Sequence, residues 1–298
     1  MELLPLTIKD KTLFTRYAKE KPHSLSSYAF ENIFIWRAHF EILWSVIGGK
    51  LCIFFKNPVG CFMILPPLGG LDARVVSECF DVMNGFNDNA EVSRIENIEE
   101  DDLSFFKENN FRIFEKAKDY IVSSQEMSGL KGERFKHKRN LVNFFLKTHN
   151  FCVRRYNAQD KEKVEELYTS WMASRMEKNN DLVYQAMLED SKKALCEELE
   201  SFADLDFSGF VVEVDGRVRA FTSGFPVTKD MFCVNFEIAD LSFKGISQFI
   251  FNHFAKELAL NFYEINIMDD SGIENIRATK LSYKPVRTPI SYTALMNV

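Results

Sequence analysis

A chain of 298 residues is long enough for two domains of about 150 residues, close to the commonest domain size. Its residues are 46% hydrophobic and include 29 Phe, which supplies apolar side chains for real cores and excludes a disordered chain. The formal net charge of -6 argues against general DNA binding, which favours a basic domain, but allows a local basic patch.

Cysteine usage and the first residues predict a cytoplasmic protein. The six cysteines are scattered and form no Cys-x-x-Cys, so we expect buried free thiols and no metal site. The opening MELLPLTIKDK lacks the charged start and long apolar core of a secretory signal. No window approaches the ~18 uninterrupted apolar residues of a membrane span, so any membrane contact would be peripheral.

The first half begins with a strand and a mainly helical stretch, and continues with a hairpin signalled by Gly48-Gly49. Hydrophobic periodicity and turn residues predict these elements in order: a strand at Leu3–Ile8, helix within 11–37, strands at Glu41–Ile47, Lys50–Lys56 and Cys61–Leu65, a helix at Asp72–Phe86, a strand at Glu91–Ile95, a helix at Asp101–Glu108, and strands at Phe111–Phe114 and Tyr120–Val122.

The second half has the clearer pattern, with Asp215-Gly216 as a strong two-residue hairpin signal. Its predicted elements are a strand at Cys152–Tyr156, helices at Lys161–Met176 and Tyr184–Phe202, strands at Gly209–Val214, Arg217–Phe225 and Met231–Glu237, a helix at Gly245–Leu260, a strand at Tyr263–Ile267, a helix at Gly272–Leu281, and an extended tail after Pro285. The two halves therefore repeat one order of elements, which predicts an α/β chain with domains at 1–127 and 151–298.

The segment between the halves, 128–150, is basic and amphipathic. Its cations are Lys131, Arg134, Lys136, Lys138, Arg139 and Lys147, against one acidic residue, Glu133. One interpretation is a solvated linker helix that packs its Phe side chains on both halves. The other is an anion-binding site at Lys138, Arg139 and Asn140 for phosphate, coenzyme A or a nucleic-acid end.

The order of a strand, two helices, an antiparallel meander, and helix–strand–helix–strand resembles the GNAT acyltransferase fold. Two copies in one chain resemble tandem GNAT proteins, which implies an α/β fold with α+β mixed sheets. Three segments are also similar to signatures of an uncharacterised bacterial family related to the catalytic C-terminal domain of phosphatidylglycerol lysyltransferases. They are DYIVSSQEMSGLKGERFKHKRNLVNFF (119–145), FEIADLSFKGISQFIFNHFAKEL (236–258) and SGIENIRATKLSYKPVR (271–287).

Two stretches depart from that family's pattern. The usual Asn-Arg-Glu-x-Asp is Asn-Ile-Met-Asp-Asp here, over 266–270, and the usual Glu-Lys pair is Glu237-Ile238. Ile238, Ile267 and Met268 thus replace charged residues of a presumed cleft, so retained catalysis does not follow from the resemblance.

The turn that holds coenzyme A in ordinary GNAT enzymes is also altered. Its usual Gln/Arg-x-x-Gly-x-Gly/Ala corresponds to 240–245 here, which contains one glycine. This disfavours acetyl-CoA bound in the standard way. Lys244 and Gly245 could still present a cation and a backbone N–H to an anion at the helix start, where the helix dipole favours negative charge, or form a plain helix start.

The resemblance implies aminoacyl-tRNA as a donor, and such a transfer needs a base and groups that stabilise an oxyanion. Glu237, Asp240 and Asp269 follow strands and are the predicted catalytic residues. The predicted substrate or anion ligands are Lys138, Arg139, Asn140, Lys244, Gly245, Asn266, Asp270, Arg277, Lys280 and Tyr283. Each of these taken singly could equally be a surface or capping residue.

The leading hypothesis is an acyltransferase of aminoacyl-transfer type with its cleft in the second half, acting on an amine or hydroxyl acceptor. A tRNA acceptor end would be its partner, and no cofactor is implied beyond an aminoacyl-tRNA or acyl-CoA donor. The rivals are a non-catalytic binding module on a degenerate GNAT fold and a conventional acyl-CoA-dependent N-acetyltransferase. The sequence has no P-loop, Gly-x-Gly-x-x-Gly, Gly-x-Ser-x-Gly or His-Glu-x-x-His motif.

Overall fold

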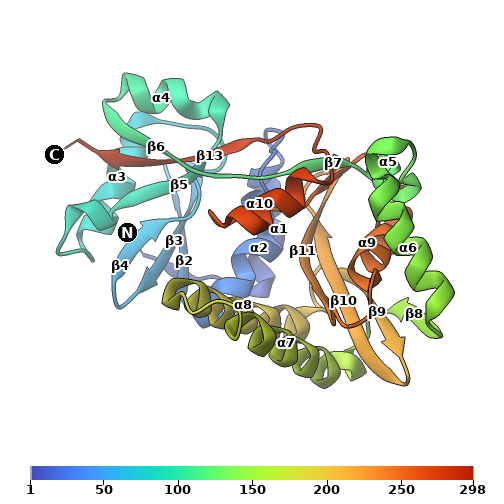
Figure 1. The fold of residues 1–298 in the computed structure, drawn as a ribbon. Helices are drawn as coiled ribbons and strands as arrows, with labels where there is room; N and C mark the ends of the chain where they lie inside the picture. Colours follow the sequence, from blue (N-terminus) through green and yellow to red (C-terminus); the bar gives the residue numbers. More distant parts are fainter. Residues whose placement is uncertain (1, 298) are drawn as a thin grey trace. The chain divides into compact units, whose positions relative to one another are not determined.

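The computed structural model describes residues 2–297 and divides them into two compact units. The first comprises the residues up to Tyr120 together with Met268–Arg277 and the residues from Thr288, and the second comprises Ile121–Ile267 and Ala278–Arg287. Each unit is built on one mixed sheet (Figure 1). The chain is therefore α/β with two mixed sheets.

The first unit contains a seven-stranded sheet in the order β1-β2-β3-β4-β5-β13-β6. Its strands are β1 (Leu4–Pro5), β2 (Glu41–Ile47), β3 (Lys50–Asn57), β4 (Gly60–Met63), β5 (Arg94–Ile98), β6 (Phe111–Lys118) and β13 (Ile290–Met296). Its helices are α1 (Lys11–Ala18), α2 (Phe30–Phe34), α3 (Ala73–Asn84) and α4 (Leu103–Glu108). Large aromatic side chains such as Phe54, Phe80 and Phe106 are fully buried within it.

Two strand predictions for the first half were wrong in detail. The strand predicted at Leu3–Ile8 is only two residues long, and a 3-10 helix at Ile8–Asp10 follows it because Thr7 and Asp10 form a capping box. The mainly helical stretch predicted within 11–37 is confirmed, as α1, α2 and short 3-10 turns. The strand predicted from Glu91 begins at Arg94, after a 3-10 turn capped by Asn89.

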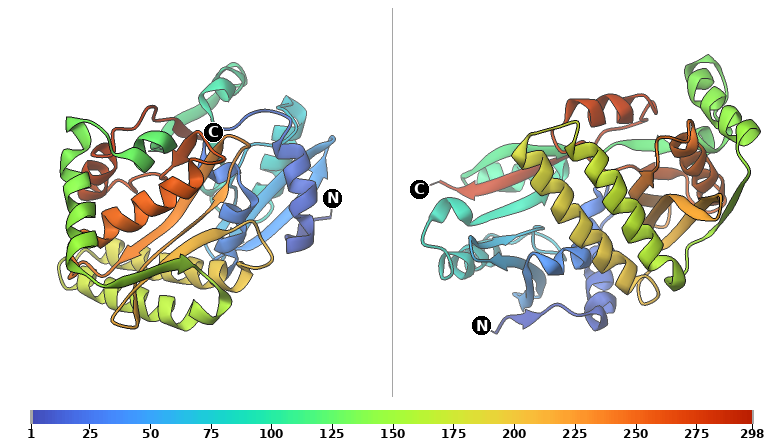
Figure 2. Two further views of the ribbon diagram at one scale, coloured as in Figure 1. Left: turned by 90° about the vertical axis from the view of Figure 1, so that its right-hand side faces the viewer. Right: turned by 60° about the horizontal axis from the view of Figure 1, so that its bottom comes forward.

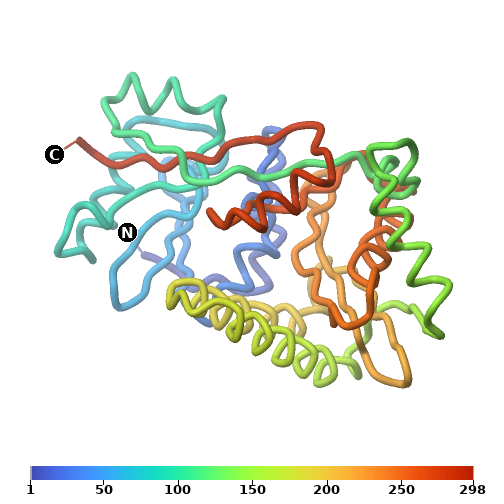
Figure 3. The backbone as a smooth tube through the Cα atoms, in the orientation of Figure 1, coloured from blue at the N-terminus to red at the C-terminus, as the bar shows by residue number. Residues whose placement is uncertain are grey.

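The last strand joins the first sheet. β13 pairs antiparallel with β5 on one side and with β6 on the other, so residues near 295 lie between residues near 95 and 112. The tube in Figure 3 follows this red segment into the sheet. The extended tail predicted after Pro285 is confirmed, but the order of elements along the chain does not reveal this pairing.

The second unit contains a six-stranded sheet in the order β7-β12-β11-β10-β9-β8. Its strands are β7 (Ile121–Ser123), β8 (Phe151–Arg155), β9 (Ser208–Val214), β10 (Arg217–Pro226), β11 (Met231–Ala239) and β12 (Glu264–Asn266). Its helices are α5 (Ser124–Gly129), α6 (Lys136–Thr148), α7 (Lys161–Met176), α8 (Leu182–Ser201) and α9 (Ile246–Leu258), and α10 (Glu274–Leu281) contributes residues to both units. The meander β9-β10-β11 predicted from Asp215-Gly216 is confirmed.

Helices cover both faces of the second sheet. On one face α5, α6 and α9 bury a core that includes Met127, Phe145 and Ile250. On the other face α7 and α8 bury a core that includes Leu167 and Leu195. The two views of Figure 2 show α7 and α8 running side by side. Within residues 2–297 no helix is both long enough and apolar enough to span a bilayer.

The basic segment is broken into two helices. Leu130 and Gly132 have left-handed backbone angles, with φ of 44° and 81°, and they separate α5 from the turn that leads into α6. The single linker helix expected across 128–150 was therefore wrong, because a residue with positive φ ends an α-helix. Both helices lie in the second unit, and α6 packs on α9.

Candidate functional site

The strands β11 and β12 diverge part-way along their length. They pair in parallel at Met231, Phe232 and Cys233, where β12 ends at Asn266, while β11 continues to Ala239. Residues 235–239 therefore have no partner on the β12 side in this register. Functional side chains gather at this divergence.

A β-bulge in β11 decides which side chains face α6 and α9. Ser223 pairs with Phe236 and Gly224 with Val234, so Asn235 is an extra residue in β11. A bulge reverses the alternation of side chains along the strand. As a result Glu237 lies on the α6 and α9 side of the sheet, whereas Phe236 and Ile238 pack with the α7 and α8 core.

Glu237 is partly buried among cations and a hydroxyl. Its Oε1 accepts a hydrogen bond of 2.5 Å from Ser247 Oγ at the start of α9. Burial raises the pKa of Glu237, and the Ser247 hydrogen bond and the charges of Lys138 and Lys280 oppose that rise. A carboxylate with a raised pKa is a stronger base than an ordinary glutamate.

Lys138 is the buried cation of this cluster, only 9% exposed in α6. Its Nζ donates to Ser282 Oγ at 2.8 Å and lies 3.3 Å from the centroid of the Tyr283 ring. Burial lowers the pKa of Lys138 to about 8, with Glu237 raising it and Lys284 lowering it further. A lysine in such surroundings exists partly as the neutral amine near pH 8.

Lys280 completes the cluster from the end of α10. Its Nζ donates to the carbonyl of Ile267, the residue that directly follows β12. The buried Tyr283 stacks edge-on against Phe251 of α9, with ring centroids 4.8 Å apart. The structure thus gathers four predicted site residues, Glu237, Lys138, Lys280 and Tyr283, where β11 and β12 diverge. We call these four residues and Ser247 the Glu237 cluster.

The turn before α9 holds the next predicted residues in structural roles. Asp240 Oδ1 accepts from Ser242 N and Oγ, and Oδ2 pairs with Arg219 at 3.0 Å. Lys244 is exposed and lies over the Phe144 ring. A Cβ at Gly245 would lie 2.2 Å from the carbonyl oxygen of Leu141, so a glycine lets α6 approach the first turn of α9.

The structure assigns Asp269, Asp270 and Arg277 to the first unit. Asp270 accepts a 2.5 Å hydrogen bond from Tyr120 Oη and forms a 2.9 Å ion pair with Arg277. Burial raises the pKa of Asp270, but the bonds from Arg277, Tyr120 and the Gly272 N–H outweigh burial and hold it below its ordinary value. This network organises the turn that leads into α10.

Three further predicted residues have other surroundings. Arg139 donates to the carbonyls of Leu130 and Gly132 and so holds the turn between α5 and α6. Asn140 is exposed on α6, and Asn266 is fully buried at the end of β12. Anion binding by these residues remains a prediction.

Sequence reasoning missed Glu198 of α8, whose side chain is completely buried. Its Oε2 accepts from Asn235 at 2.6 Å, and no partner within residues 2–297 satisfies its Oε1. Burial raises the pKa of Glu198 to about 7, against the opposing effects of Ser223 and Asn235. The sequence does not indicate this burial. Glu198 stands in the acidic run CEELES, where a glutamate is expected to face solvent.

A cavity of about 280 Å³ in the first unit includes Asp269 in its wall. Aromatic side chains from Trp36, Phe40 and Phe62 form its apolar part, and Asn97 and Asp119 also line it. Asn97 of β5 has a positive φ of 52°, and its Nδ2 donates to the carbonyl of Ile64, the residue after β4. In residues 2–297 no group of three or more His, Cys, Asp or Glu side chains is placed to hold a metal ion.

Residues 19–294 match the family described as phosphatidylglycerol lysyltransferase, C-terminal. The chain belongs to this family. The match spans elements of both units, from the residue that directly follows α1 into β13. A comparison with curated proteins found no match.

Solved structures share the family fold across the whole chain. A conserved protein of unknown function from Bacteroides thetaiotaomicron has a TM-score of 0.88 at 24% identity, with 100% of both chains covered. L-PGS from Bacillus licheniformis has a TM-score of 0.65 at 15% identity, with 96% of this chain and 92% of that chain covered. A tandem GNAT protein from the clavulanic acid biosynthesis pathway has a TM-score of 0.52 at 8% identity, with 100% and 99% covered. These similarities establish a GNAT-like fold.

The structure explains one departure from the family pattern. Ile238, which replaces the lysine of the usual Glu-Lys pair, is 2% exposed and packs in the α7 and α8 core. It thus faces away from Glu237 across the sheet. Ile267, by contrast, packs against the core on the α9 side, next to the Glu237 cluster.

Proposed function

We propose that this protein is an acyltransferase of the aminoacyl-transfer type, with its reaction centre at the Glu237 cluster. The observation that carries the proposal is the gathering of Glu237, bonded to Ser247, with the buried Lys138 over the Tyr283 ring. Each group influences the other electrostatically, and the pKa of Glu237 is raised while that of Lys138 is lowered to about 8. Two groups whose surroundings shift their pKa values toward neutrality in opposite directions are typical of acid–base catalysis. Membership of the phosphatidylglycerol lysyltransferase C-terminal family supports the same reaction class.

The proposed reaction moves an aminoacyl group from an ester to an amine or hydroxyl acceptor. Glu237 removes the proton of the acceptor as its nitrogen or oxygen attacks the ester carbonyl. Lys138 and Lys280 stabilise the negative charge that develops on the carbonyl oxygen. The tetrahedral intermediate then collapses, the carbon–oxygen bond to the donor breaks, and the leaving alcohol takes the proton from Glu237.

Two donors are compatible with this chemistry, and one of them is favoured. Coenzyme A in ordinary GNAT enzymes needs its pyrophosphate at the first turn of the helix that corresponds to α9. Here the α6 backbone approaches that turn so closely that a Cβ at Gly245 would lie 2.2 Å from Leu141 O. The aminoacyl ester of a tRNA is therefore the proposed donor. Lys244 and Arg139 are retained as proposed ligands of its acceptor end.

The test is a transfer assay with the purified protein, total tRNA charged with labelled amino acids, and phosphatidylglycerol vesicles or small amines as acceptors. Glu237→Gln removes the base but keeps the shape, and we expect transfer to fall by about 100-fold or more. Glu166→Gln, which changes an exposed carboxylate on α7, is the matched control and should transfer normally.

A parallel thermal-shift series separates the rival functions. Stabilisation that rises with the concentration of a non-hydrolysable aminoacyl-adenosine supports aminoacyl transfer, whereas stabilisation by coenzyme A supports an acetyltransferase. Transfer that is unaffected by Glu237→Gln would remove the Glu237 cluster from the mechanism. A ligand that binds without any transfer would favour the non-catalytic binding module, for which the apolar replacements Ile267 and Met268 are the motivating observation.

A further inference from the structure

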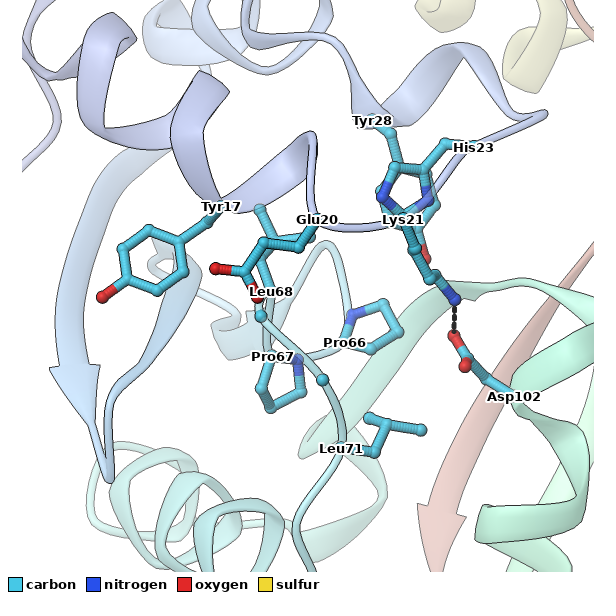
Figure 4. Close-up of a pocket in the computed structure, with 12 residues that line it drawn as sticks. Tyr17, Glu20, Lys21, His23, Tyr28, Pro66, Pro67, Leu68, Leu71 and Asp102 are labelled. Carbon is cyan, nitrogen blue, oxygen red and sulfur yellow. Dashed lines mark hydrogen bonds and ion pairs between the residues drawn. The ribbon is translucent and has the colours of Figure 1, made fainter.

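The first unit contains a second cavity, of about 230 Å³, that the proposed function does not use. Tyr17, Glu20 and Lys21 line it from the end of α1 and the residues that follow. The loop from Pro66 to Leu71, which connects β4 to α3, lines its other side (Figure 4). Its wall therefore combines apolar rings with a few charged groups, which is usual for a small-molecule site.

Most charged groups of this wall already have partners within the protein. Lys21 pairs with Asp102 at 2.6 Å, the contact drawn as a dashed line in Figure 4. The buried His23 bonds through Nδ1 to Glu99 at 2.8 Å and stacks on Tyr28, with ring centroids 3.8 Å apart. These contacts tie the wall residues to one another, and Lys21 and Asp102 neutralise each other.

Glu20 is the exception. Within residues 2–297 no hydrogen-bond donor or cation contacts its carboxylate, which Figure 4 shows directed between Tyr17 and Leu68. Lys50, at the start of β3, donates its Nζ to the carbonyl of Gly69. Glu20 is exposed, so the cavity wall presents one solvent-accessible carboxylate that no side chain of the described residues pairs.

The Tyr17 ring and the Glu20 carboxylate meet at Gly69. A Cβ built on Gly69 would lie 2.9 Å from Tyr17 Cδ1 and 3.4 Å from Glu20 Oε2. Gly69 and Gly70 have φ of 96° and 101°, which favours glycine, so the loop can pass close to the ring without a side chain in the way. An aromatic face beside a carboxylate is the arrangement that binds an ammonium group.

We propose that this cavity binds a small primary alkylammonium ligand, whose nitrogen pairs with Glu20 and packs on the Tyr17 ring. Pro66, Pro67 and Leu71 would contact its carbon chain. The volume equals that of roughly eight water molecules at ~30 Å³ each, which suits a ligand of about seven to ten heavy atoms. A diamine and a basic amino acid share this chemistry. The site is independent of the Glu237 cluster.

The test measures binding of cadaverine, L-lysine and the uncharged 1,5-pentanediol to the full chain by calorimetry and by ligand-observed NMR. We expect cadaverine to bind at least tenfold more tightly than pentanediol, which has the same length and no charge. L-lysine distinguishes a basic amino acid from a diamine as the ligand. Its carboxylate is accommodated only if the wall near Lys21 tolerates an anion.

Glu20→Gln should weaken cadaverine binding at least tenfold, and Tyr17→Leu should weaken it several-fold while the apolar contact is kept. Glu108→Gln, which changes an exposed carboxylate of the same unit, and Glu237→Gln in the second unit should leave it unchanged. Equal binding of cadaverine and pentanediol, or unaltered binding by Glu20→Gln, would overturn the proposal. Loss of binding in Glu237→Gln would also overturn it, since the ligand would then occupy the proposed reaction centre.

Discussion

The ammonium group of Lys138 lies 3.3 Å from the centroid of the Tyr283 ring, and both side chains are buried in the second unit. The ring face offers the charge an attractive quadrupole, and Ser282 accepts one hydrogen bond from it. These contacts only partly replace water, because burial still lowers the pKa of Lys138 to about 8. The cation is thus kept in the Glu237 cluster at a cost in stability.

That cost predicts how Lys138→Met changes stability with pH. A lysine whose folded pKa is about 8 releases its proton before an unfolded lysine does, so between about pH 8 and 10.5 the unfolded state binds more protons. The free energy of unfolding of the wild type should therefore rise over this range by about 2 kcal/mol relative to Lys138→Met. Urea titrations of both proteins at pH 7 and pH 10 measure this difference in the free energy of unfolding. Parallel pH profiles of the two proteins would contradict the prediction.

Glu198 predicts the opposite pH dependence, at lower pH. Its folded pKa of about 7 lies above the ordinary value, so the folded state holds the proton that the unfolded chain releases near pH 4.5. Stability should fall as the pH rises from about 4.5 to 7, by roughly 3 kcal/mol, and stay low above pH 7. Glu198→Gln cannot ionise and should show no such fall.

The comparison is made by thermal unfolding of wild type and Glu198→Gln at pH 5 and pH 8. We expect the melting temperature of Glu198→Gln, relative to that of the wild type, to be several degrees higher at pH 8 than at pH 5. Glu197→Gln, which changes the neighbouring partly exposed carboxylate, controls for the loss of one negative charge. A constant difference between wild type and Glu198→Gln at both pH values would mean that Glu198 is ionised throughout.

Gly245→Ala should destabilise the second unit by more than Gly216→Ala. Both glycines have positive φ, of 91° and 72°, so each substitution introduces backbone strain of about 1 kcal/mol. Only at Gly245 does the added Cβ also collide with backbone, 2.2 Å from Leu141 O, whereas nothing lies within 4 Å at Gly216. We expect a total loss of about 3 kcal/mol for Gly245→Ala in denaturant unfolding. Equal losses would show that α6 can move away without cost.

Asp270→Asn should destabilise the first unit by about 1–3 kcal/mol, because it weakens charge-assisted bonds from Arg277 and Tyr120. Tyr120→Phe removes a single donor and should cost less. The folded pKa of Asp270 is lowered, so its contribution is present above the ordinary aspartate pKa and is lost as the pH falls through the folded value. Denaturant unfolding at pH 7 and pH 3 measures both effects. A pH-independent cost would assign Asp270 a purely packing role.

Much of the fold could be predicted from sequence, because the signals are local. The Asp215-Gly216 hairpin and the helical spacing of Ile246, Phe249 and Ile250 located β9, β10 and α9 correctly. The resemblance to the phosphatidylglycerol lysyltransferase family is confirmed. Of the predicted site, Glu237, Lys138, Lys280 and Tyr283 come together as a group.

The rest depends on contacts that sequence spacing does not encode. The bulge at Asn235 reverses which face of the sheet the later side chains of β11 point to, and no residue in the strand predicts a bulge there. Asp269 and Asp270 follow β12 by only a few residues, yet they lie in the first unit, because the chain turns at Ile267–Met268. Glu198 looks like one more surface carboxylate until α8 is placed against β10 and β11.

The position of β13 between β5 and β6 has a consequence for synthesis on the ribosome. In the first sheet β5 and β6 are separated by fewer than twenty residues along the chain. The strand that lies between them, β13, is translated more than 170 residues after β6. Until residues 290–296 emerge, both strands have an open edge facing the gap, and open edges recruit foreign strands. The first strands of this sheet are therefore synthesised early, and the sheet is completed only at the end of translation. A nascent chain stalled in its second half would expose an incomplete sheet that is prone to aggregation.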